Sequence, residues 1–145
     1  MQDNIYSENT IIDHILNRKI EYCNNNGISI KCMVSGVFKG ISDYDMHIIL
    51  ENLLDNAIEA ALKTDDKRIG VDIYSDEQAI VIKISNSAEE NVLKNNPEMN
   101  TTKKDNSYHG YGIKNVCELI KKNNGTIEYI QLGINTVQCR VLLML

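Results

Sequence analysis

The fold is decided by one stretch of the chain, Asn52-Leu53-Leu54-Asp55-Asn56-Ala57-Ile58-Glu59-Ala60. Around it, from Met46 to Leu62, apolar residues recur at helical spacing and predict a helix with one buried face. The polar residues of the stretch stand at i, i+3, i+4 and i+7 and share the other face: Asn52, Asp55, Asn56 and Glu59. Asn and Asp cost roughly 0.5 kcal/mol or more relative to Ala inside a helix, because their side chains compete for backbone hydrogen bonds. Their grouping favours a stripe of oxygen ligands for Mg²⁺ and a phosphate chain; the alternative is an ordinary solvated face.

Length, charge and cysteine spacing exclude several classes of protein. The 145 residues predict a single domain, 1–145, and the formal charge of -5 with scattered Lys and Arg argues against nucleic acid or an anionic membrane as a partner. No apolar run approaches the roughly 20 residues that span a bilayer, and the N-terminus has no signal-peptide character. We therefore expect a soluble, cytoplasmic domain. The cysteines lack the spacing of a zinc site or a disulfide framework: Cys23, Cys32, Cys117 and Cys139.

The hydrophobic periodicity predicts three helices and five strands. Helices are expected over residues 9–26, with Ser7 or Asn9 as the cap, over 46–62, entered at Ser42 or Asp43, and over about 112–122. Strands are expected over residues 28–34, 68–74, 79–85, 126–132 and 136–145. This order predicts an α/β fold, a two-layer α/β sandwich in which a mixed sheet carries its helices on one face.

A long polar segment interrupts this pattern after Asn86. Residues 87–109 contain the only proline and no sustained period, and loops of this length in compact domains are usually functional lids. The segment ends in His109-Gly110-Tyr111-Gly112, where two glycines let the backbone approach an anion at a helix N-terminus. A G-x-G sequence alone indicates only a tight turn. Its combination with the polar helix stripe favours a phosphate site.

These segments together resemble the GHKL superfamily of ATP-binding domains, whose members include sensor histidine kinases, type II topoisomerase ATPase subunits, heat-shock-90 chaperones and MutL repair proteins. NLLDNAIEA resembles the asparagine box of the family, HGYGIKNV its second glycine box, and Thr101-Thr102-Lys103 the threonine-lysine segment of many kinase lids. The opening residues, together with the TTK and HGYG segments, are most similar to peptide-sensing quorum kinases of the accessory-gene-regulator type. The resemblance implies the GHKL (Bergerat) fold, with ATP and Mg²⁺ as cofactors.

The resemblance also implies roles for individual residues. Asn56 would coordinate Mg²⁺, Asn52 would face the phosphates, and Lys103 would reach the terminal phosphate from the lid, with Thr102 beside it. Other positions would line the nucleoside side, form the lid hinge or present backbone to the phosphates: Glu59, Asn86, Thr136, His109, Gly110, Tyr111, Gly112 and Ile113. Thr136 matches a position that touches the adenine side, commonly through water.

Two departures from the family pattern bear on function. Asn86 stands where the family has the Asp that binds adenine, and a neutral acceptor makes a weaker hydrogen bond than a carboxylate. Asn52 stands where hydrolysing members carry a Glu general base, and an amide cannot take that role. Glu51 is adjacent but points roughly 100° away around the helix. An ATPase of the topoisomerase or chaperone type is therefore disfavoured.

The resemblance then implies the catalytic and ATP-binding domain of a two-component sensor histidine kinase, an ATP-dependent phosphotransferase. It would present the γ-phosphate to a histidine on a dimerisation hairpin of the same parent kinase, absent from this chain, so no catalytic residue is assigned here. A response regulator would be an indirect partner, and the domain would be the cytosolic part of a membrane-bound kinase. The alternatives are an anti-sigma-factor-type serine kinase and a degenerate GHKL binding module without ATP turnover.

Overall fold

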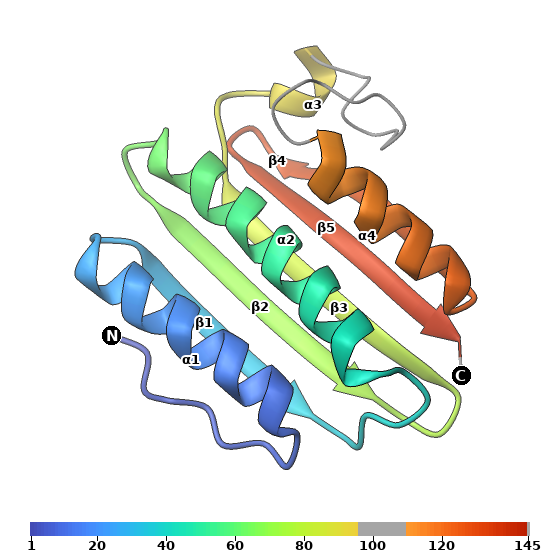
Figure 1. Ribbon diagram of the computed structural model, residues 1–145. Coiled ribbons are helices and arrows are strands. Elements are labelled where there is room, and N and C mark those ends of the chain that lie inside the picture. The colour runs from blue at the N-terminus through green and yellow to red at the C-terminus, as the bar shows by residue number, and fades with distance from the viewer. Residues whose placement is uncertain (96–109, 145) are drawn as a thin grey trace.

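Five strands form one mixed sheet in the computed structural model, which describes residues 1–95 and 110–144 (Figure 1). The strand order is β1-β2-β3-β5-β4; β1 and β2 are parallel, and the other neighbours are antiparallel. The helices are α1 (Thr10–Asn25), α2 (Asp43–Leu62), α3 (Val92–Asn95) and α4 (Gly110–Lys122). The strands are β1 (Ser29–Ser35), β2 (Arg68–Ser75), β3 (Ala79–Ser87), β4 (Gly125–Gly133) and β5 (Thr136–Met144).

The predicted two-layer architecture is confirmed. Helices α1, α2 and α4 lie side by side over one face of the sheet (Figure 1). Along β3 the buried residues alternate with partly exposed ones, as expected for a strand with one covered face: Ile80, Ile82 and Ile84. The helices contribute the opposite half of the core through residues that recur at helical spacing: Ile12, Ile15, Leu16, Ile49, Leu50 and Leu54. Apolar burial on this scale is the main force that holds α2 against the sheet.

Side-chain caps fix where the first two long helices begin. The Asn9 side chain accepts a hydrogen bond from the Ile12 amide at 2.9 Å, and the Ser42 hydroxyl accepts one from the Asp45 amide at 3.1 Å. Each cap satisfies an N–H group that the first helical turn leaves without a partner. Both residues were among the caps that the sequence predicts. The cap at Ser42 starts α2 at Asp43, in agreement with the expected entry at Ser42 or Asp43 and ahead of the apolar pattern that begins at Met46.

The expected loop over residues 87–109 is wrong for its first part. Ser87 is the last residue of β3, and the backbone then bonds to the turn between β4 and β5: Ala88 N–H donates to the Asn135 carbonyl at 2.8 Å. Leu93 of α3 is buried with Ala88 and Val137 in a small apolar cluster. Two apolar residues of this segment are too few to give a periodic signal, yet they suffice to dock it against Val137 of β5. Residues 96–109 of the expected lid lie outside the described part of the chain.

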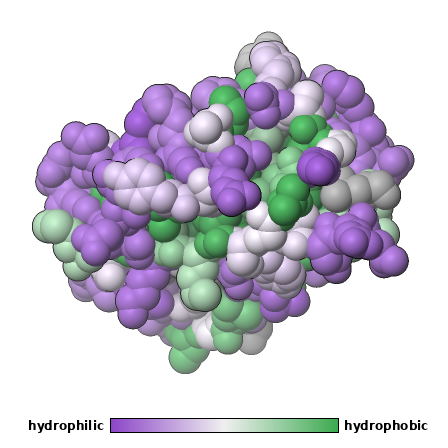
Figure 2. All heavy atoms as spheres, turned by 90° about the horizontal axis from the view of Figure 1, so that it is seen from below, coloured by the Kyte–Doolittle hydropathy of each residue, from purple (hydrophilic) through white to green (hydrophobic). Residues whose placement is uncertain are grey.

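The surface agrees with the mildly acidic composition. Seen from below, it is mainly hydrophilic, and hydrophobic residues are exposed in smaller groups between the polar ones (Figure 2). Scattered apolar residues of this kind are normal on globular domains. Among the described residues, no helix combines the length and hydropathy needed to cross a bilayer.

Candidate functional site

One face of α2 is directed toward α4, and Asp45 shows which face it is. Asp45 has a nearly buried carboxylate that accepts hydrogen bonds from Lys122 at 3.1 Å and from Asn123 at 3.2 Å, at the C-terminal end of α4. With about 100° per residue, Asp45 falls on the same stripe as Asn52 and Asn56, within about 60° of arc. The stripe that the sequence predicts to bind a ligand therefore faces α4.

The two helices run in opposite directions along this contact. The N-terminal turn of α2 meets the C-terminal end of α4, so the second half of α2 points toward the start of α4 (Figure 1). Asn56 and Glu59 lie in that second half, and Gly110 begins α4. The start of a helix carries unpaired N–H groups and a partial positive charge that suit phosphate oxygens. Amide side chains and phosphate-binding backbone are thus expected to face the same space.

The donors on the stripe fit a hard cation held together with phosphates. Asn52 and Asn56 are partly buried, and the Asn52 amide nitrogen donates to the Ile48 carbonyl at 2.7 Å, which leaves its oxygen as the acceptor for a ligand. Amide oxygens are normal ligands of Mg²⁺, which also takes ligands from substrate phosphates. Among the described residues, no group of three His, Cys, Asp or Glu side chains could hold a metal alone. A cation at this stripe would need the nucleotide to complete its coordination.

Asn86 lies on the covered face of the sheet at the end of β3. It pairs in register with Ile69 of β2 and Val137 of β5, and both of these neighbours are buried on the helical side. The Asn86 side-chain nitrogen donates to the Ser87 carbonyl at 2.9 Å. This bond uses the amide nitrogen and leaves the amide oxygen as the acceptor, the polarity that an adenine amino group requires.

A hydroxyl pair missed by the sequence analysis ties the end of α2 to the sheet next to Asn86. Ser87 is fully buried, and its hydroxyl lies 2.8 Å from the hydroxyl of Thr64, directly after α2. The same Ser87 oxygen accepts the Arg68 amide at 2.9 Å. Buried hydroxyls need such partners. No sequence signal marks this pair, because Ser87 follows the polar residues Ser85 and Asn86 and its partner Thr64 lies 23 residues away.

The structure does not bring Thr136 together with Asn86. Thr136 pairs in register with Ser87, so the alternation of the strand directs it to the face opposite Val137 and Asn86. Its hydroxyl accepts a hydrogen bond from the Arg68 guanidinium at 3.2 Å. The expected contact of Thr136 with the adenine side, commonly through water, stays a prediction.

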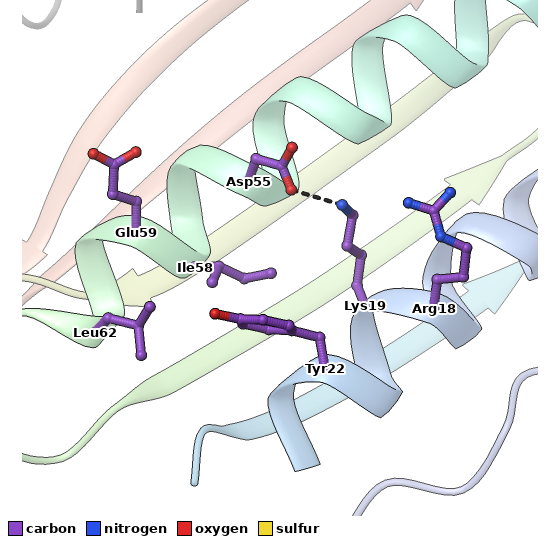
Figure 3. A pocket seen from close by; sticks show the side chains of 7 residues that line it. All are labelled: Arg18, Lys19, Tyr22, Asp55, Ile58, Glu59 and Leu62. Atoms are coloured by element: carbon purple, nitrogen blue, oxygen red, sulfur yellow. Dashed lines mark hydrogen bonds and ion pairs between the residues drawn. The ribbon is translucent and has the colours of Figure 1, made fainter. Parts of the chain in front are cut away.

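Asp55 also departs from the expected ligand stripe. Its carboxylate bonds to Lys19 of α1 at 2.6 Å, on the side of α2 away from α4 (Figure 3). Figure 3 shows Glu59, by contrast, pointing away from α1. Asp55 precedes Asn56 by one residue and is therefore rotated by about 100° around the helix axis. This rotation places Asp55 at the edge of the stripe, within reach of α1.

Glu51 is bound in the same ion cluster. Its carboxylate oxygen Oε1 accepts from Lys19 at 2.9 Å and from Arg18 at 3.0 Å. Burial of Glu51 opposes its ionisation, but the hydrogen bond and charge of Lys19, together with Arg18, outweigh burial and lower the pKa of this carboxyl. A carboxylate held by two cations on the α1 side is poorly placed and too weakly basic to activate water beside Asn52.

The remaining expected site residues are only partly covered by the structure. Thr102, Lys103 and His109 lie outside the described residues. For Gly110, Tyr111, Gly112 and Ile113 the structure gives the helical backbone at the start of α4. The described part of the site therefore consists of the α2 stripe, the end of β3 and the first turn of α4.

Comparison with known proteins agrees with this arrangement. The sequence profile of the GHKL domain family matches residues 41–142, from the loop before α2 through most of β5. The chain is a GHKL domain. The catalytic domain of histidine kinase ThkA, in a nucleotide-free form, has a similar structure, with a TM-score of 0.73 at 16% sequence identity over 99% of this chain and 97% of that one. A mycobacterial sensor histidine kinase, MprB, gives 0.68 at 16% identity over 92% and 93% of the two chains.

At this level of identity, the two structures establish the fold of the domain. Its chemistry has to be argued from its own residues. No relative was found among curated protein sequences.

Proposed function

We propose that this GHKL domain is the catalytic and ATP-binding domain of a two-component sensor histidine kinase. It binds Mg·ATP and presents the γ-phosphate to a histidine on a dimerisation hairpin, which is not part of this chain. The observation that supports this most is the stripe of Asn52 and Asn56 on α2, which faces α4 because Asp45 on the same stripe bonds to Lys122. A response regulator would receive the phosphoryl group in turn, and the parent kinase would be membrane-bound with this domain in the cytosol.

The residues of this chain would hold and orient the nucleotide. Asn56 would ligate Mg²⁺ through its amide oxygen, Asn52 would face the phosphates, and the backbone of residues 110–113 would bind the phosphate chain. The amide oxygen of Asn86 would accept the adenine amino proton, and Glu59 would line the pocket. Mg²⁺, when bound, neutralises phosphate charge. Phosphoryl transfer depends mainly on such positioning and electrostatics.

Two further features favour phosphotransfer over ATP hydrolysis. Asn52 cannot remove a proton from water, and Glu51 is held on the α1 side by Lys19. We extend the proposal to a lid in the part of residues 87–109 that follows the docked residues 87–95, with Thr102 and Lys103 near the terminal phosphate and His109 at its hinge. The quorum-sensing type is proposed from the sequence resemblance of the first residues.

Two measurements on the isolated domain test the proposal. Calorimetric titration should detect Mg·ATP binding, and incubation with γ-labelled ATP should leave the chain unlabelled, since the acceptor hairpin is absent. Label on a serine would favour the anti-sigma-factor-type serine kinase. Label on His14, which is exposed on α1, would likewise contradict the proposal. An absence of Mg·ATP binding would favour the degenerate binding module.

A further inference from the structure

A buried lysine joins α1 to α2 on the side away from α4. The Lys19 side chain is only 9% exposed, and its ammonium lies 2.6 Å from the Asp55 carboxylate and 2.9 Å from that of Glu51. Figure 3 shows the first of these ion pairs spanning the two helices. Arg18 adds a bond of 3.0 Å to the same Glu51 oxygen. A buried ammonium is tolerated only while its partners stay in place, so this cluster strongly favours one relative position of the helices.

The two acidic partners of Lys19 are the chain neighbours of the two proposed nucleotide ligands. Glu51 directly precedes Asn52, and Asp55 directly precedes Asn56. In a helix, adjacent side chains are fixed about 100° apart. Any rotation of α2 that moves Glu51 and Asp55 away from α1 therefore turns Asn52 and Asn56 away from the start of α4 by the same angle.

A surface pocket lies between α1 and α2 beside the ion cluster. This pocket of about 440 Å³ opens between the helices toward the C-terminal end of α2, bordered by Tyr22, Ile58 and Leu62 (Figure 3). Tyr22 is 44% exposed. The apolar core holds this half of α2 on the sheet through buried residues such as Leu54 and Ala57. The ion cluster of Lys19 adds a directional contact to α1 at the edge of that core.

We propose that Lys19 is a positioning residue of the nucleotide site: it holds α2 in the rotation at which Asn52 and Asn56 face the start of α4. The inference rests on the proposed Mg·ATP function. Lys19 lies on α1, on the side of α2 opposite to α4. It would nevertheless contribute to the affinity for the metal–nucleotide complex.

The test compares Mg·ATP binding with metal-free ADP binding in Lys19→Met, which keeps most of the length of the side chain and removes the charge. Displaced Asn52 and Asn56 should weaken Mg·ATP binding about tenfold, whereas ADP in the presence of a chelator should change less than about twofold because it does not need the Asn56 ligand. Arg18→Met is the matched control. It removes a neighbouring cation that is about half exposed, and it should leave both affinities within about twofold.

A second variant separates positioning from stability. Lys19→Met leaves Glu51 with Arg18 as its remaining partner and should lower the melting temperature. Lys19→Met/Glu51→Gln removes the carboxylate that has lost its buried partner and should recover most of the melting temperature, but it should keep the weak Mg·ATP binding. Unchanged Mg·ATP binding in this double variant, or equal losses for Mg·ATP and ADP, would overturn the inference about Lys19 and leave the proposed function unaffected. Absence of Mg·ATP binding by the unmodified domain would overturn the proposed function and this inference together.

Discussion

The two sides of α2 are fastened in different ways. Toward α1, the polar contact lies in the middle of the helix, where Lys19 binds Glu51 and Asp55. Toward α4, the described polar contact lies in the first turn, where Asp45 binds Lys122 and Asn123. The side without a mid-helix ion cluster is the one that carries Asn52 and Asn56. The difference indicates that contacts with α1 position the middle of α2, so that the side toward α4 can bind a ligand.

Replacing Asn56 should give the largest effect, because it tests the ligand side directly. Asn56→Ala should weaken Mg·ATP binding by at least about 100-fold, since removing even an outer-shell partner at metal sites costs 10–100-fold in affinity. The melting temperature should stay close to that of the unmodified domain, because the side chain lies off the core face of α2. Calorimetry and circular dichroism measure the two quantities.

The matched control is Asn25→Ala, the same chemical change on an exposed position of α1. It should leave binding intact. An unfolded Asn56→Ala variant would mean that the polar stripe is structural, and the contrast between the two sides of α2 would then be lost.

Asp45→Ala should give the next largest effect, on stability. The carboxylate accepts two hydrogen bonds in a nearly buried position, and bonds to charged groups contribute about 1.5–3 kcal/mol. We expect the free energy of unfolding to fall by about 2 kcal/mol, measured by urea denaturation. Asp43→Ala removes an exposed acid from the same helical turn and should change stability by less than about 0.5 kcal/mol. Equal effects of the two substitutions would show that Asp45 does not fasten α2 to α4.

Asn86→Asp should tighten ATP binding modestly. A carboxylate would accept the adenine amino proton as a charge-assisted bond, while its burial would cost part of the gain. The net improvement should be roughly five- to tenfold, about 1 to 1.4 kcal/mol. Titration of both forms with ATP and GTP is the measurement. Unchanged or weaker ATP binding would show that Asn86 does not contact adenine.

The pH dependence of stability should show the smallest effect, on the α1 side. The pKa of Glu51 is lowered in the folded state below its ordinary value of 4.5, despite burial, chiefly through Lys19. Its stabilising contribution is therefore present above pH 4.5 and is lost as the pH falls through the folded-state pKa. In Glu51→Gln, the free energy of unfolding should therefore fall less steeply as the pH is lowered below 4.5. A slope identical to that of the unmodified domain would contradict the ion cluster.

Much of the fold follows from local signals in the sequence. The core residues of α2 recur at helical spacing, and Asn9 and Ser42 cap their helices through contacts within three residues of the chain. The face shared by Asn52 and Asn56 is predictable for the same reason, because helical geometry is periodic.

The contacts that the sequence analysis missed join distant segments. Asp55 was placed on the ligand stripe, but its partner Lys19 is 36 residues away and lies on another helix. The orientation of Thr136 depends on the register of β5 against β3, which periodicity alone does not fix. The docking of residues 87–95 rests on single apolar residues such as Leu93. Long-range partners of this kind require the tertiary structure.

The hydroxyl pair of Thr64 and Ser87 has a mechanical consequence for α2. Asp45 makes the corresponding polar contact at the start of α2, so the helix is anchored at both of its ends. Between these two ends, the ion cluster of Lys19 is the described polar contact that joins the middle of α2 to α1. A ligand that pulls on Asn56 would therefore strain the Lys19 contact at the neighbouring residue Asp55.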